Sequence, residues 1–178
     1  KFNGSMVHLA GYSDQSGRLA AQKIRFSDKS EGMPWVGEKN GLALFGAHLF
    51  GRGRRIVITE GEIDAMSMSQ AQGNKWPVVS VINGASGAKK DIASNLEYLA
   101  NFEEIVLMFD NDEAGQAAVE QVAEVLTGHK VFIATLPLKD ASEMFVAGRI
   151  DELGKATWNA KPYAPASVMF GEEIWARL

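Results

Sequence analysis

The chain has 178 residues, enough for one complete α/β domain and a smaller second unit. Its hydrophobic content of 46% is ordinary for a globular protein, and no run approaches the roughly 20 apolar residues of a membrane span. Cysteine is absent, which excludes disulfides and cysteine-based zinc sites. No signal peptide is visible and the chain begins with Lys1, so we expect a fragment of a longer protein with no membrane contact.

The net charge of −4 is unevenly distributed along the chain. Residues 1–55 hold nine Lys/Arg and four Asp/Glu, a net of +5, whereas residues 56–178 hold nine and 18, a net of −9. A basic segment is therefore joined to an acidic one. Two ordinary solvated surfaces would give this pattern, and so would an anion-binding unit beside a cation-binding one.

The first part of the chain, residues 1–53, predicts a small basic α+β subdomain. Alternating apolar residues predict strands over 6–12 and 19–26, and the turn signal Asp-Gln-Ser-Gly at 14–17 lies between them. The stretch 27–53 is rich in glycine and charge, and we expect it to be mostly irregular.

Residues 54–160 predict an α/β domain with a parallel sheet. Short apolar runs predict four buried strands, over 56–59, 78–82, 104–109 and 130–136. Helices are expected over 62–72, from a loop at 83–87 to about 99, over 113–126, and over the short stretches 140–147 and 149–157. Such alternation gives right-handed βαβ units, whose ligand sites lie beyond the carboxyl ends of the strands.

Residues 161–178 are expected to lie outside that domain. The stretch 161–166 contains two prolines and is interpreted as a linker. The apolar positions of 167–178 predict a short amphipathic helix.

Acidic residues follow three of the four predicted strands. Glu60 follows the first strand, Asp110 ends the third with Asp112 just beyond it, and Asp140 follows the fourth. These carboxylates should meet at one sheet edge, where their mutual repulsion is unfavourable unless a cation neutralises it. Hard oxygen ligands select Mg²⁺, Mn²⁺ or Ca²⁺ over Zn²⁺.

A structural role for the same acids is the alternative. Each could be a helix N-cap or first-turn residue, and Asp112 and Glu113 fit that role well. Acids at three strand ends together favour the cation. A calcium-binding EF-hand is excluded, because the segment 110–112 lacks the downstream loop glycine and the terminal glutamate at the required offset.

Two motifs resemble the signatures of the Toprim (topoisomerase–primase) family. Thr-Glu-Gly-Glu-Ile-Asp at 59–64 follows one predicted strand, and Phe-Asp-Asn-Asp-Glu-Ala-Gly at 109–115 follows another, about 50 residues later. Gly61 permits a tight turn in the first motif. The Asn-Gly pair at 83–84 lies where the family has its intervening motif. The resemblance implies a Rossmann-like core with a four-stranded parallel sheet.

Further segments resemble the primase half of bacteriophage primase-helicases of the T-seven type, so nearly the whole chain is covered. They are Gln-Lys-Ile-Arg at 22–25, Ala-Leu-Phe-Gly at 43–46, Gly-Ala-Ser-Gly-Ala-Lys-Lys at 84–90 and Leu-Pro-Leu-Lys-Asp-Ala at 136–141. Such proteins carry a zinc-binding domain before this region and a hexameric helicase after it, and neither lies in this chain. The resemblance implies a place in a phage replisome in the bacterial cytoplasm, with the 167–178 helix packed against a neighbouring helicase subunit.

The activity implied by the resemblance is that of a DNA primase core, a DNA-directed RNA polymerase. It would join NTPs into short primers on single-stranded DNA, using one or two Mg²⁺ ions, with Mn²⁺ as a substitute. Asp110 and Asp112 are the first candidate ligands, and Asp140 is a second-tier ligand through water. Glu60 is either a ligand or the base that takes the 3′-hydroxyl proton. The remaining motif residues have a supporting role: Gly61, Glu62 and Asp64.

Basic residues are needed for the triphosphate and the template. The resemblance nominates Lys23, Arg25, Lys29, Lys89 and Lys90. Lys23 and Arg25 share one strand face, with Ile24 turned toward a core, although an exposed charged face would look the same. The pair at 89–90 is expected near a helix start, where the dipole disfavours cations unless an anion is bound. Trp35 is either a stacking surface for a base or a core residue.

Two other functions share these motifs. One is a Toprim module that no longer catalyses and serves as a DNA-binding or assembly part of a replicative helicase. The other is a Toprim nuclease, which uses the same metal site to cleave DNA. The presence of Glu60, Asp110 and Asp112 favours catalysis, and the basic N-terminal subdomain favours synthesis. A topoisomerase is disfavoured, because none of the three tyrosines lies in a recognisable nucleophile context.

Overall fold

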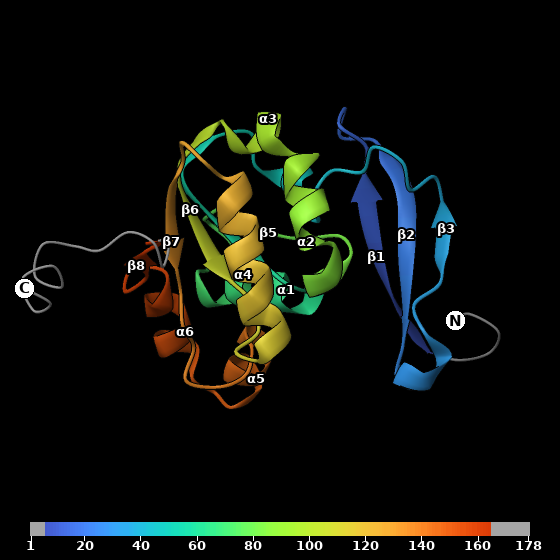
Figure 1. The fold of residues 1–178 in the computed structure, drawn as a ribbon. Helices are drawn as coiled ribbons and strands as arrows, with labels where there is room; N and C mark the ends of the chain where they lie inside the picture. The colour runs from blue at the N-terminus through green and yellow to red at the C-terminus, as the bar shows by residue number, and fades with distance from the viewer. Residues whose placement is uncertain (1–5, 165–178) are drawn as a thin grey trace, which may run out of the picture.

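The structure is a computed structural model that describes residues 6–164, with Lys29 described by its backbone alone (Figure 1). The helix predicted over 167–178 lies outside these residues. Within 6–164, no helix is long and apolar enough to cross a membrane.

The N-terminal subdomain is built on a three-stranded antiparallel sheet in the order β1-β2-β3. Strands β1 (Val7–Ser13) and β2 (Leu19–Phe26) confirm the two predicted strands. The expectation of a mostly irregular segment over 27–53 was wrong in part. It contains β3 (Trp35–Gly37) and two 3-10 turns, η1 (Lys29–Glu31) and η2 (Ala47–Leu49). A three-residue strand is too short for its alternation to be detected, and pairing with β2 defines it.

The larger sheet has five strands in the order β5-β4-β6-β7-β8. Four are parallel and confirm the predicted core: β4 (Gly53–Thr59), β5 (Val78–Ser80), β6 (Phe102–Met108) and β7 (Lys130–Ile133). The fifth, β8 (Lys161–Pro162), is antiparallel and lies within the segment expected to be a linker. Proline is tolerated there because β8 is an edge strand, and the next backbone N–H, of Tyr163, donates to the Val131 carbonyl.

Helices cover both faces of this sheet. One face is covered by α2 (Gly84–Ala93), α3 (Leu96–Leu99) and α4 (Glu113–Val125). The other face is covered by α1 (Glu62–Ala71), α5 (Ala141–Val146) and α6 (Ile150–Ala156). Ile56 and Ile58 of β4 pack toward the first set, and Val57 between them packs toward the second. Burial on both faces explains why the strands are continuous apolar runs.

The segment after β5 differs from the prediction. A loop was expected over 83–87, but α2 begins at Gly84, whose φ of +64° a residue with a side chain rarely adopts. The single helix expected to reach residue 99 is divided into α2 and α3. The break lies at Asn95, whose buried side-chain amide donates to the Asp91 carbonyl.

The three-stranded sheet lies beside the α/β domain, close to α2 (Figure 1). The junction is a small core of Tyr12, Ala21, Leu42 and Ile82. A β-bridge between Phe45 and Ser80 adds backbone hydrogen bonds at the end of β5. The basic subdomain is therefore held against the carboxyl end of the larger sheet.

Candidate functional site

Acidic side chains gather at the carboxyl edge of the central strands. β4 and β6 are neighbours in register, with Thr59 opposite Met108, so the chain leaves both strands at the same edge. Glu60 follows β4, Asp110 follows β6, and Asp112 is the N-cap of α4. Asp110 and Asp112 lie close enough to Glu60 to raise its pKa by repulsion. The rule that parallel strands end at one edge predicted this gathering from the sequence.

Glu60 carries the least satisfied carboxylate of this edge. Its Oε1 accepts a hydrogen bond from the Ala85 N–H at 3.2 Å, at the start of α2. Its Oε2 is buried and has no hydrogen-bond partner within the described chain. Burial first, and then the charge of Asp110, raise the pKa of Glu60, against the backbone N–H groups of Ala85 and Asp110, which lower it. A buried acceptor without a donor fits a bound cation or an incoming proton.

Lys139 bridges the other two acids. Its Nζ lies 3.3 Å from Asp110 Oδ2 and 3.3 Å from Asp112 Oδ2. Burial raises the pKa of Asp110 in spite of this contact, whereas a hydrogen bond from the Gly115 N–H lowers that of Asp112. The ammonium group therefore lies between the two carboxylates, at a place where a divalent cation could be bound by both. Lys139 lies within one of the segments that resemble phage primases, but no sequence pattern marked it as a site residue.

Asp112 and Asp140 also serve as helix caps. Asp112 Oδ1 accepts from the Gly115 N–H at 2.9 Å, and Asp140 Oδ1 accepts from the Glu143 N–H at 2.7 Å. The capping alternative is thus correct for both, but it uses one oxygen of each. Within residues 6–164, no three His, Cys, Asp or Glu side chains converge closely enough to form a ready metal cage. The arrangement fits a cation held by few protein oxygens, with water completing its shell.

Asp64 joins two helices at this edge. Its Oδ1 accepts from the Ser142 N–H at 2.9 Å, which ties α1 to α5. Burial raises the pKa of Asp64 to about 7, against the effect of that hydrogen bond. A Cβ at Gly61 would lie 2.8 Å from Asp64 Oδ2, so glycine leaves room for this carboxylate. Both residues therefore support the motif through its geometry.

Glu62 faces the N-terminal subdomain. Its Oε1 accepts from Lys23 Nζ at 2.7 Å and from the Tyr12 hydroxyl at 2.5 Å, and Lys23 also donates to the Ile82 carbonyl at 2.8 Å. Burial alone would raise the pKa of Glu62, but the hydrogen bonds from Lys23 and Tyr12 outweigh it and the pKa is lowered. Lys23 and Arg25 line the same small hollow beside Glu62, and Ile24 is buried on the other face, as predicted. The Lys23 ammonium is, however, engaged by protein groups.

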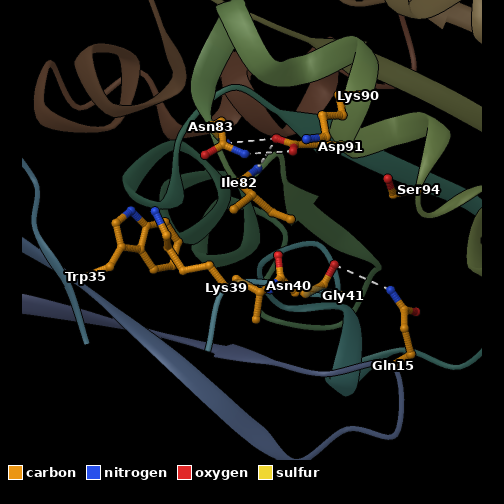
Figure 2. A pocket seen from close by; sticks show the side chains of 11 residues that line it. Gln15, Trp35, Lys39, Asn40, Gly41, Ile82, Asn83, Lys90, Asp91 and Ser94 are labelled. Atoms are coloured by element: carbon orange, nitrogen blue, oxygen red, sulfur yellow. Dashed lines mark hydrogen bonds between the residues drawn. The ribbon is translucent and has the colours of Figure 1, made fainter. Parts of the chain in front are cut away.

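A larger hollow of about 410 Å³ lies between the subdomain and α2 (Figure 2). Figure 2 shows Trp35 and Lys39 on one side of it, and Asn83 and Lys90 on the other. Neither lysine is in an ion pair with a carboxylate of the described chain. Asp91 also lines the hollow, but its oxygens accept from the Ile82 and Asn83 N–H groups and the Asn83 amide. The hollow thus holds an indole ring and two lysine ammonium groups that are not paired with a carboxylate of the described residues.

The prediction for the lysine pair at 89–90 was wrong in its reasoning. Because α2 begins at Gly84, Lys90 lies in the last turn, where the helix dipole favours a cation. Lys89 points elsewhere and pairs with Glu124 at 3.0 Å. Lys90 remains a site candidate through the hollow, and Lys39 joins it, although sequence patterns gave no reason to select Lys39 among the charged residues of its segment.

Residues 57–145 match the sequence profile of the Toprim-like family, and the chain belongs to that family. It is 45% identical over 169 residues to the DNA helicase/primase of Enterobacteria phage T3, which covers 95% of this chain and 30% of that protein. The crystal structure of the primase fragment of the bacteriophage T7 primase-helicase is 46% identical, with a TM-score of 0.81 over 89% of this chain and 65% of that one.

A second T7 structure is also similar, at 47% identity and a TM-score of 0.85 over 92% of this chain and 82% of that one. It is described as the lagging-strand DNA polymerase interacting with primase domains bound to an RNA/DNA hybrid and dTTP. These matches confirm the Toprim fold and the resemblance to phage primases. The chain spans about a third of the T3 protein.

Proposed function

We propose that this chain is the RNA-polymerising core of a DNA primase, which joins NTPs into short RNA primers on a single-stranded DNA template. The observation that carries the proposal is the buried, partnerless Oε2 of Glu60, within the described residues, at the edge that Asp110 and Asp112 share. The similarity to a helicase/primase and to primase domains bound to an RNA/DNA hybrid supports it.

The organisation of the longer protein is part of the proposal. We divide the chain into a basic subdomain over 1–53 and a catalytic Toprim domain that begins at 54 and extends past the expected boundary at 160, because β8 pairs with β7. The chain would stand between a zinc-binding domain and a hexameric helicase, in the bacterial cytoplasm during phage infection. The separate three-stranded and five-stranded sheets support the first boundary.

The carboxylate edge fits a divalent cation. The ammonium of Lys139, at 3.3 Å from both Asp110 and Asp112, is a stand-in for that charge. Carboxylate oxygens favour Mg²⁺, with Mn²⁺ as a substitute, as one or two ions, and Asp140 would reach them through water. When bound, the cation neutralises the transferring phosphoryl group and makes the attacking hydroxyl more acidic. The chain's own part is to hold Asp110 and Asp112 at adjacent positions by the β6–α4 turn.

Glu60 takes the proton in this proposal. The 3′-oxygen of the growing primer attacks the α-phosphorus of an NTP, the bond to pyrophosphate breaks, and the 3′-hydroxyl proton must leave. Oε2 of Glu60 is free to accept that proton, while Oε1 is fixed by the Ala85 N–H. The raised pKa makes this carboxylate a better proton acceptor than an ordinary one.

The hollow between the two units is the proposed nucleotide and template cradle. Lys39 and Lys90 supply charge for phosphates and Trp35 supplies a ring face for a base. Lys23 contributes by position, because its contact with Glu62 fastens β2 beside the catalytic edge. Arg25 and Lys29 remain proposed contacts of the nucleic-acid backbone.

The experiment that tests the function is extension of a labelled dinucleotide on single-stranded DNA with NTPs and Mg²⁺. Extension by added ribonucleotides, absent when Mg²⁺ is chelated, is the expected result. Cleavage of the DNA without extension would replace the proposal with a nuclease. Binding of DNA with neither extension nor cleavage, at a template concentration that saturates binding, would replace it with a non-catalytic module.

A further inference from the structure

A second groove lies at the amino-terminal edge of the five-stranded sheet, away from the carboxylates. Its volume is about 530 Å³ and its walls come from the start of β4, the turn before β5 and the end of α6. β4 begins at Gly53 beside this groove and ends at Thr59, next to Glu60. The wall of the groove reaches Val57, and the seven residues of β4 put about 20 Å between its outer rim at Gly53 and the catalytic edge. The groove is therefore a separate surface.

Two tryptophans are exposed at the groove. Trp76 is 55% exposed and Trp158 is 66% exposed, which is costly for large apolar rings. Trp158 is also held in place, because the Arg55 guanidinium lies 5.2 Å from its ring centre and 5.2 Å from that of Phe132. Arg55 is itself fixed by Glu104 and by the Thr157 carbonyl, which accepts its hydrogen bond at 2.6 Å. Trp158 is thus an indole of fixed orientation at an open surface.

The rim of the groove is basic. Arg52, Arg54 and Lys75 line it and are exposed. Arg52 and Lys75 have no ion-pair partner in the described residues, and Arg54 reaches the buried Glu104, which it shares with Arg55, at 3.3 Å. Arg52 and Arg54 belong to the net basic segment 1–55, and Lys75 adds a third positive charge from the acidic part of the chain. The groove therefore offers positive charge together with aromatic faces.

One acceptor in the groove also lacks a partner. The Gln72 side chain lines it, with Nε2 donating to Thr157 Oγ1 at 3.2 Å, and Oε1 has no hydrogen-bond partner within residues 6–164. Because that oxygen is buried, it does not select the ligand. The two indole faces match nucleobases, and the basic rim matches their phosphates.

We propose that this groove binds single-stranded nucleic acid, with bases against Trp76 and Trp158 and phosphates at Arg52, Arg54 and Lys75. An acidic peptide would use the same charges, but two exposed indoles give stacking surfaces that a carboxylate-rich chain does not need. Because the groove lies a strand length from the catalytic edge, it adds affinity for strands long enough to reach both. The proposal stands apart from catalysis at Glu60.

The test uses the full 178-residue chain and fluorescence anisotropy of labelled oligothymidylates and oligouridylates of increasing length. Trp76→Ala is expected to weaken binding of long oligonucleotides about tenfold, because one base no longer stacks. The double variant Arg52→Gln/Lys75→Gln should reduce the slope of log affinity against log salt by about one for each phosphate that is no longer bound. The matched control is Arg18→Gln/Arg149→Gln, which makes the same charge change at two exposed ion pairs. It should leave the slope closer to wild type.

The groove variants are first compared with wild type by urea unfolding, and only variants with an unchanged midpoint are used. Equal affinity of these variants and wild type for every length would overturn the proposal. So would binding of an acidic peptide at Trp158, detected by its fluorescence, if oligonucleotides did not compete. A folded Trp76→Ala chain should still extend a dinucleotide on a short template. Failure of wild type to extend would refute the proposed function and leave the groove measurement intact.

Discussion

Replacing Lys23 by Met tests the contact that fastens the N-terminal subdomain to the α/β domain. The side chains of Lys23 and Glu62 are 13% and 8% exposed, so solvent screens their 2.7 Å contact weakly. Lys23→Met keeps the length of the side chain and leaves the Glu62 carboxylate with Tyr12 as its remaining side-chain donor. Removing one partner of a buried ion pair costs about 3–5 kcal/mol, which is large against the roughly 5–15 kcal/mol of a whole domain.

The assay is urea unfolding at neutral pH, with the free energy of unfolding compared between wild type, Lys23→Met, Glu62→Gln and the double variant. Lys23→Met is expected to lose about 3 kcal/mol or more. The double variant should be more stable than Lys23→Met, because Glu62→Gln removes the unpaired charge while keeping an acceptor for Tyr12. A loss below about 1 kcal/mol for Lys23→Met would refute the reasoning, since it would mean that Glu62 is solvated or protonated without its partner.

Three further changes have defined outcomes. A methyl group at Gly115 would overlap the backbone carbonyl of Asp110, so Gly115→Ala should lower the free energy of unfolding by about 1–3 kcal/mol and reduce primer extension. The control is Gly51→Ala, because the space around a Cβ at Gly51 is open. Equal stability of the two variants in urea would contradict the prediction. A hydrogen bond from the Ser16 hydroxyl first, and then the Arg18 N–H, lower the pKa of Asp14 to about 2. The charged Asp14 therefore contributes to stability above about pH 4, and this contribution is lost as the pH falls toward 2. Asp14→Asn should flatten this part of the curve of unfolding free energy against pH. An unchanged slope would contradict the role of the hydrogen bonds to Asp14. Lys139→Gln removes the ammonium that competes with a metal ion for Asp110 and Asp112. Mn²⁺ binding, followed by electron paramagnetic resonance, should therefore become about fivefold tighter. Weaker binding would show that Lys139 supports the cation instead.

Features with a long or periodic pattern could be predicted from the sequence. The four parallel strands are continuous apolar runs because helices cover both faces of their sheet, and strand ends then bring Glu60 and Asp110 to one edge. Short elements could not be predicted, because β3 and β8 are defined by pairing with distant strands and carry almost no pattern of their own. The start of α2 was missed since it depends on the positive φ of Gly84.

Single charged residues were the hardest part of the site to predict. Lys139 became a site candidate because the fold places it beside Asp110 and Asp112. Lys39 became one because it lines the hollow between the subdomain and α2. Lys23 was selected as a site residue from the motif alone, and its contact with Glu62 could not be predicted because it links segments 39 residues apart. The groove at Trp76 and Trp158 joins residues still further apart, so no local motif indicates it.

The most direct test of the proposed catalytic role of Glu60 is to compare primer extension by the Glu60→Gln and Glu113→Gln variants. Both changes remove one carboxylate near the same edge, but Glu113 is exposed on the first turn of α4, outside the contacts of the cluster. Glu60→Gln is expected to lower the rate of dinucleotide extension about 100-fold or more while DNA binding and the urea midpoint stay at wild-type values. Glu113→Gln should extend like wild type. Extension by a folded Glu60→Gln chain within a few-fold of wild type would contradict the assignment of the catalytic edge.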